Sequence, residues 1–134
     1  MRVAIVHYHL APGGVTVVIE SASRALAAAG IPHAVIAGDH PQSDRDLHPT
    51  SRPQPVHGLG YRTHPGDITA DELLASLRSA AASALGGPPD IWHFHNHSLG
   101  KNILIPDVVA RLAEAGERLV LQIHDLAEAG RPGN

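Results

Sequence analysis

The 134-residue sequence contains no cysteine, one lysine and only four aromatic side chains. The missing cysteines exclude a disulfide scaffold, a thiolate zinc site and a cysteine nucleophile. The formal net charge of −3 argues against a protein that coats nucleic acid, so we expect no nucleic-acid partner. No apolar run approaches the roughly 20 residues that span a bilayer. His7 and His9 interrupt the apolar opening, which argues against a signal peptide, and we expect a cytoplasmic domain.

Hydrophobic residues make up 43% of the chain, which is enough for the core of one domain. Short apolar runs of the kind buried in parallel sheets predict four strands, at residues 3–6, 34–37, 90–95 and 119–124. Helical periodicity bounded by caps and glycines predicts three helices between them, at residues 15–29, 70–85 and 106–115. We therefore expect an α/β fold, with a Rossmann-like parallel sheet and helices on both of its faces.

The segment 38–67 holds five prolines and few large apolar side chains, so we expect it to be mostly loop. Residues 56–61 could add a short edge strand. A connection of this length inside a compact domain is typically either mobile or functional. Because the chain stops just after a strand, we expect the sheet to be unfinished, as in a fragment of a longer protein.

Three polar segments follow the predicted strands, at residues 8–14, 95–102 and 124–125. In open parallel sheets, ligands bind beyond the carboxyl ends of the strands, so these segments form the candidate site. Gly13 and Gly14 immediately precede a helix, where the backbone could approach an anion such as phosphate closely. The alternative is that the two glycines only permit a tight turn, since the sequence matches neither the Walker loop nor the full dinucleotide-binding pattern.

Histidines mark the other two segments. His93, His95 and His97 would share one face of an extended strand, a spacing typical of metal-dependent hydrolases. The alternative is a core histidine followed by residues that line a polar cleft. His124 closes the last strand, and the neighbouring carboxylate of Asp125 could orient it.

The only lysine, Lys101, lies beside Asn102, and this pair could bind a phosphate or a sugar hydroxyl. The alternative is an ordinary solvated lysine. No carboxylate follows the histidine run, because Ser98 and Leu99 come next, and we expect no metal ion in the site.

Three stretches of the sequence resemble the amino-terminal end of family 4 glycosyltransferases of the GT-B fold, namely residues 2–15, 90–97 and 121–125. They occur in the same order and spacing, and the likeness covers nearly the whole chain except the proline-rich loop. The resemblance implies that residues 1–134 form the acceptor-side domain of a two-domain retaining glycosyltransferase. The carboxyl-terminal donor-binding domain is absent from the sequence, so we expect this domain to be inactive in hexosyl transfer on its own.

The resemblance also implies roles for individual residues. Gly13 and Gly14 would approach the donor diphosphate, and His124 would contact the transferred sugar. His124 and Asp125 are the candidate catalytic residues, with a positioning and electrostatic role, because the family has no obvious protein nucleophile. The other candidate substrate-binding residues are His95, Asn96, His97, Lys101 and Asn102.

The implied partners are a nucleotide-sugar donor, bound mainly by the absent domain, and a sugar, lipid-linked or small-molecule acceptor. The full-length protein could also contact a membrane surface peripherally, and no cofactor is expected. Two other functions stay open on the sequence. One is a metal-dependent hydrolase acting through His93, His95 and His97, and the other is a small nucleotide- or phosphate-binding module acting through Gly13 and Gly14.

Overall fold

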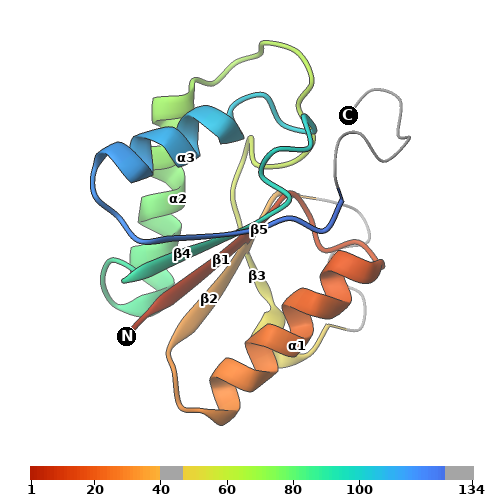
Figure 1. Ribbon diagram of the computed structural model, residues 1–134, viewed down its shortest axis with the longest axis vertical. Coiled ribbons are helices and arrows are strands. Elements are labelled where there is room, and N and C mark those ends of the chain that lie inside the picture. The colour runs from red at the N-terminus through yellow and green to blue at the C-terminus, as the bar shows by residue number, and fades with distance from the viewer. Residues whose placement is uncertain (40–46, 126–134) are drawn as a thin grey trace.

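The computed structural model of the chain describes residues 1–39 and 47–125. Within them, five parallel strands form one sheet in the order β3-β2-β1-β4-β5 (Figure 1). The strands are β1 (Val3–His7), β2 (His33–Ala37), β3 (Pro53–Pro55), β4 (Ile91–His95) and β5 (Leu119–Gln122). The helices are α1 (Gly14–Ala28), α2 (Ala70–Leu85) and α3 (Ile105–Glu114), with one turn of 3₁₀ helix at Pro49–Ser51. The predicted α/β class and parallel sheet are confirmed.

Each face of the sheet has its own hydrophobic core. On one face, Ile19 of α1 packs against a cluster that includes Ile5 of β1 and Val35 of β2. On the other face, α2 and α3 pack on the sheet through a larger cluster that includes Leu77 and Trp92. Figure 1 shows α1 below the sheet and α2 and α3 above it. Burial on both faces explains why the central strands are almost continuous apolar runs.

The ends of α2 follow the sequence signals. The Thr69 hydroxyl accepts a hydrogen bond from the Glu72 N–H at 3.2 Å, and the Glu72 carboxylate accepts one from the Thr69 N–H at 2.8 Å. This reciprocal pair is the predicted capping box. Gly86 ends the helix with a φ of 71°, in the left-handed region that glycine adopts without strain.

The edge strand lies at β3 and not at residues 56–61, so that prediction was wrong. The Val56 N–H donates to the Ala37 carbonyl of β2 at 2.9 Å. Because N–H groups alternate in direction along a strand, the nitrogens of Pro53 and Pro55 face away from β2, where a proline costs no ladder bond. The apolar side chains that suggested a strand at 56–61 fill the core from a loop instead.

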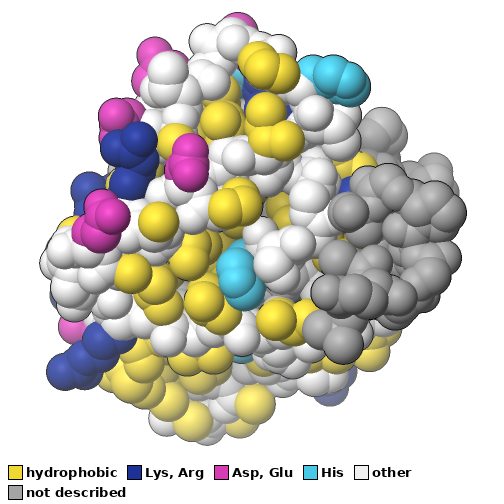
Figure 2. Space-filling view, turned by 45° about the horizontal axis from the view of Figure 1, so that its top comes forward, with side chains coloured by type: hydrophobic (Ala, Val, Ile, Leu, Met, Phe, Trp, Pro, Cys, Tyr) yellow, Lys and Arg dark blue, Asp and Glu magenta, His cyan; other side chains and the backbone are white. Residues whose placement is uncertain are grey.

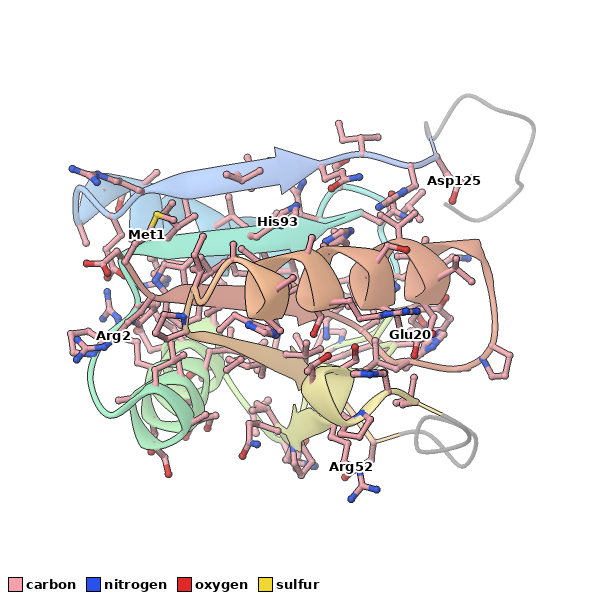
Figure 3. All side chains as sticks on the ribbon, turned by 90° about the horizontal axis from the view of Figure 1, so that it is seen from below. Met1, Arg2, Glu20, Arg52, His93 and Asp125 are labelled. Carbon is pink, nitrogen blue, oxygen red and sulfur yellow. The ribbon has the colours of Figure 1, made fainter. Side chains whose placement is uncertain are left out.

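The opposite edge of the sheet is less covered within the described residues. β5 ends at Gln122 rather than at residue 124, and Val120, Leu121 and Ile123 are 45%, 41% and 48% exposed. Figure 2 shows hydrophobic side chains over much of one face of the molecule. Figure 3 shows α1 crossing over β1 and leaving β4 and β5 uncovered on that side.

Among the described helices, none combines the length and the apolar character that crossing a membrane requires.

Candidate functional site

A cavity of about 470 Å³ lies at the carboxyl ends of β1, β4 and β5, where ligands of parallel sheets bind. Its wall combines the turn before α1, the segments that follow β4 and β5, and one tyrosine from the long loop. Figure 3 shows Asp125 beyond the end of β5, at the same end of the sheet as the start of α1. The lining residues are His7, Tyr8, His9, Ala11, Pro12, Gly13, Gly14, Val15, Thr16, Val18, Tyr61, Asn96, Leu99, Lys101, His124 and Asp125.

Two glycines form part of this wall, and the fold requires glycine at neither position. A Cβ added to Gly14 would meet no atom within 4 Å, and one added to Gly13 would lie 3.9 Å from the Ala11 carbonyl, an ordinary contact. Gly13 has a φ of 168°, which is extended backbone open to any residue. Gly14 opens α1, and the first N–H groups of a helix have no partner within it. The missing side chains therefore leave the N-terminus of α1 accessible from the cavity.

Asn96 connects the ends of β4 and β5. Its backbone has a φ of 54°, in the left-handed region, which Asn tolerates better than most residues. Its N–H donates to the Gln122 carbonyl at 2.8 Å, and its side-chain oxygen accepts the N–H of His124 at 2.7 Å. The same oxygen accepts the N–H of Asp125 at 3.3 Å. The buried side chain of Asn96 thus fixes where the chain leaves β5 and enters the cavity wall.

The imidazoles of His95 and His124 form a hydrogen-bonded pair across the two strand ends. The distance from Nδ1 of His95 to Nε2 of His124 is 2.7 Å. His95 is 2% exposed, whereas His124 is half-buried and lines the cavity. Burial, followed by the neighbouring imidazoles of His93, His124 and His7, lowers the pKa of His95 to about 3. His95 is therefore a neutral imidazole at physiological pH.

Two more histidines surround this pair. Burial is the largest cause that lowers the pKa of His7 to about 4, although a bond between its Nδ1 and the His95 carbonyl at 3.2 Å opposes the shift. Burial also lowers the pKa of His93, whose Nε2 contacts the Gln122 side-chain oxygen at 2.9 Å. His7, His93 and His95 consequently carry little positive charge at neutral pH.

Aromatic side chains and the lysine form another part of the wall. The Tyr8 hydroxyl donates to the Asn96 carbonyl at 2.6 Å, and burial raises the pKa of this phenol. Tyr61 contacts Tyr8 and His9 edge-on, with ring centroids 5.5 and 5.0 Å apart. The Lys101 ammonium lies 5.8 Å from the centre of the Tyr61 ring, within the range of a cation–π contact.

The cavity brings together six of the predicted site residues, which are Gly13, Gly14, Asn96, Lys101, His124 and Asp125. His95 lies behind the wall and is linked to it by the hydrogen bond to His124. His97 does not line the cavity, because β4 ends at His95 and the chain then turns at Asn96. The predicted alternation therefore places only His93 and His95 on one face, with ring centroids 4.3 Å apart.

Asn102, predicted to bind substrate, also lies outside the cavity wall. Its amide nitrogen donates to the carbonyls of Gly58 and Gly60, both at 2.7 Å, and to that of Leu59 at 3.2 Å. Its side-chain oxygen accepts the N–H of Leu104 at 2.9 Å. The three bonds of the amide nitrogen stabilise the loop at residues 58–60, so the Asn102 side chain has a structural role. They also help to position the neighbouring Tyr61.

Sequence reasoning missed several lining residues. Tyr61 carried no signal, because it lies in a loop without periodicity, and its place in the cavity wall depends on long-range contacts of that loop such as the bonds of Asn102. His7 is the last residue of β1, one position before the segment that the strand-end rule selected. Tyr8 was inside that segment but was not singled out. Among the described residues, no three His, Asp or Glu side chains are arranged to hold a metal ion.

The fold and this cavity define a Rossmann-like α/β domain with a ligand site at the carboxyl edge of its sheet. A family model described as the glycosyl transferase 4-like domain matches residues 13–134. The chain therefore belongs to the glycosyl transferase 4-like domain family, and its resemblance to the amino-terminal domain of family 4 GT-B glycosyltransferases is confirmed. The match begins at Gly13, so it does not include β1. No curated protein and no solved structure matched the chain.

Proposed function

We propose that this chain is the acceptor-side domain of a glycosyltransferase that moves a sugar from a nucleoside-diphosphate donor to an acceptor hydroxyl, with retention at the anomeric carbon. The family supports the transferase class over the hydrolase and binding-module alternatives. In the proposed reaction the acceptor oxygen bonds to the anomeric carbon as the bond to the diphosphate oxygen breaks. The acceptor proton passes to the departing diphosphate.

The observation that carries this proposal is the pair of glycines in the cavity wall. Gly13 and Gly14 line the cavity, yet neither close packing nor a left-handed backbone requires glycine there. Absent side chains at the N-terminus of a 15-residue helix suit the close approach of an anion to backbone N–H groups. A donor diphosphate is such an anion. The alternative, that the two glycines only permit a tight turn, is disfavoured because the backbone at Gly13 and Gly14 does not require glycine.

The transferred sugar would then lie between the start of α1 and the end of β5. His124 and Asp125 border that space, and Asn96 holds the backbone of both. We assign His124 a positioning and electrostatic role toward the sugar, with Asp125 beside it. Asn96 and Lys101 border the same cavity as candidate substrate contacts.

The donor nucleotide would be held mainly by a second, carboxyl-terminal domain, as the GT-B resemblance implies. The 134-residue chain alone should therefore transfer no sugar from a panel of nucleoside-diphosphate sugars to any hydroxyl acceptor. Turnover by the isolated chain would refute the two-domain proposal.

The sharpest test adds bulk at Gly14 in the full-length enzyme. A Cβ at Gly14 meets no described atom within 4 Å, so we expect Gly14→Val to leave the thermal midpoint unchanged. The added side chain would occupy the space proposed for the diphosphate and should lower kcat/KM for the donor about tenfold or more, equivalent to about 1.4 kcal/mol. Ala25→Val, on an exposed position of the same helix, is the matched control and should leave kcat/KM unchanged. If the folded Gly14→Val variant had the wild-type kcat/KM for the donor, the proposal that these glycines bind the donor diphosphate would be wrong.

A further inference from the structure

The contact between His95 and His124 has the geometry of a hydrogen bond in the plane of both rings. The two ring planes differ by 12° and their centroids are 5.0 Å apart. Rings stacked face to face could not bring Nδ1 of His95 to 2.7 Å from Nε2 of His124 at that centroid separation. The two nitrogens therefore point at each other, and one proton lies between them.

Each of the two possible directions for this bond fixes a different set of tautomers. If Nδ1 of His95 donates, His95 carries its proton on Nδ1, and a neutral His124 carries its proton on Nδ1 as well. If Nε2 of His124 donates, a neutral His95 carries its proton on Nε2. The choice decides whether the free nitrogen of His124 is a donor or an acceptor.

The surroundings of His95 distinguish the two directions. Nε2 of His95 is buried and has no hydrogen-bond partner among residues 1–39 and 47–125. A proton on that nitrogen would be a buried N–H without an acceptor, which is rarer in proteins than an unused acceptor. With the proton of His95 on Nδ1, that N–H is used in the bond to His124. The second proton of the neutral pair then lies on Nδ1 of His124, a residue that is half-buried at the cavity wall.

We propose that His95 is a positioning residue, which donates from Nδ1 to Nε2 of His124 and so holds the proton of His124 on Nδ1. His124 then offers an N–H donor and no free lone pair. It can hold a sugar hydroxyl or stabilise charge growing on an oxygen, but it cannot act as a general base. The catalytic meaning of this arrangement rests on the proposed function, whereas the placement of the proton does not.

Two other groups near His95 leave this assignment intact. His7 contacts the backbone carbonyl of His95 and not its ring nitrogens. The ring of His93 lies beside that of His95, but Nε2 of His93 contacts Gln122. Within the described residues, neither histidine accepts a hydrogen bond from Nε2 of His95, which agrees with the unpartnered state of that nitrogen.

The direct test is NMR of the histidine ring nitrogens in the ¹⁵N-labelled 134-residue chain at neutral pH, because protonated and bare imidazole nitrogens resonate far apart. We expect His124 in the Nδ1–H form in the wild-type chain. His124 in the Nε2–H form would overturn the proposal whatever the protein does. This measurement needs no activity, so it separates failure of the proton placement from failure of the proposed function.

Variants then test whether His95 is the cause. His95→Phe removes the donor while filling a similar volume, and His124 should shift toward Nε2–H. His95→Asn keeps an N–H donor at the position of Nδ1 and should retain the Nδ1–H form even if the phenylalanine variant folds poorly. His93→Phe, on the same strand and face, is the control and should leave the tautomer unchanged. An unchanged Nδ1–H form in folded His95→Phe would show that His95 does not set it.

The full-length enzyme gives the functional readout. His95→Phe should lower kcat about tenfold or more with little change in KM, and His95→Asn should recover most of that loss. A lowered thermal midpoint with normal kcat would leave His95 a purely structural residue and would refute the positioning role.

Discussion

The side-chain oxygen of Asn96 accepts the backbone N–H of His124 at 2.7 Å, so the residue after β4 determines the position of the second residue after β5. Asn96 can do this because its φ of 54° turns the chain back toward β5 immediately after the strand. The Tyr8 hydroxyl donates to the carbonyl of Asn96 at 2.6 Å and ties in the end of β1. The backbone and the side chain of one buried residue, Asn96, therefore link three strand ends at the cavity.

Substitutions at Asn96 should separate its backbone role from its side-chain role. Asn96→Gly keeps the left-handed backbone and loses the bonds to His124 and Asp125, at a cost of about 1–3 kcal/mol in the free energy of unfolding. Asn96→Ala loses the same bonds and adds left-handed strain, so it should cost about 1–2 kcal/mol more than glycine. Urea denaturation of both variants measures the difference. Equal stability of the two would show that the φ of Asn96 carries no cost.

The stability of the domain should fall as the pH is lowered from 7 toward 4. The folded-state pKa values of His7 and His95, about 4 and about 3, lie below the usual value of 6.5. Below pH 6.5 the unfolded chain binds protons at these histidines and the folded chain does not. The free energy of unfolding should then fall by up to about 1.4 kcal/mol per pH unit for each histidine. The loss levels off below the folded-state pKa of each group.

Denaturant unfolding at pH 7, 6 and 5 measures this slope. His95→Phe should flatten it, because one of the histidines with a lowered pKa is gone. Phe94→Leu, a buried neighbour that does not titrate, is the control and should lower stability by a similar amount at every pH. An unchanged slope in His95→Phe would contradict the depressed pKa of His95.

Gly38→Ala should destabilise the fold through a backbone clash. A Cβ at Gly38 would overlap the backbone nitrogen of Gly60 and lie 2.8 Å from the Tyr8 carbonyl. Relieving this overlap requires a shift of the loop that carries Gly60 and Tyr61 or of the end of β1, so we expect a loss of about 1–3 kcal/mol. Gly60→Ala is the matched control, because its Cβ would lie 3.9 Å from the Asp39 carbonyl and 4.0 Å from that of Tyr8. Thermal midpoints of the two variants measure the contrast, and similar values would refute the close approach.

His124→Ala in the full-length enzyme should lower kcat more than it raises KM. The interaction proposed for this side chain strengthens in the transition state, and its loss should cost on the order of 10²-fold in kcat. The thermal midpoint should stay near that of the wild type, because His124 is only half-buried. His64→Ala, at an exposed loop position, is the control. A normal kcat, or a loss explained entirely by unfolding, would remove His124 from the site.

The larger elements of this fold were predictable because each has a local signal. The capping box at Thr69, the glycine stop at Gly86 and the apolar runs of β1, β2 and β4 specify their elements within a few residues. β3 has no such signal, since a three-residue strand with two prolines contains neither alternation nor β-branched residues. Its place in the sheet depends on pairing with β2, which is a long-range contact.

The location of the site was also predictable, but the role of each side chain was not. The strand-end rule selected the segments around Gly14, Asn96 and His124 because parallel strands share one carboxyl edge. Which side chains face the cavity depends on where β4 stops and how Asn96 turns, and the sequence pattern contains neither. Asn102 illustrates the limit, because a polar residue beside Lys101 looks like a ligand contact until its bonds to the loop are seen.

The two prolines of β3 make the sheet chemically asymmetric at its borders. Along the outer side of β3, Pro53 and Pro55 present carbonyl oxygens but no N–H donors, so an incoming strand would find acceptors without donors. β5, at the other border, contains no proline in its span from Leu119 to Gln122 and keeps its full set of amides. The β5 border therefore offers an incoming strand both donors and acceptors, whereas the β3 border lacks the donors at Pro53 and Pro55.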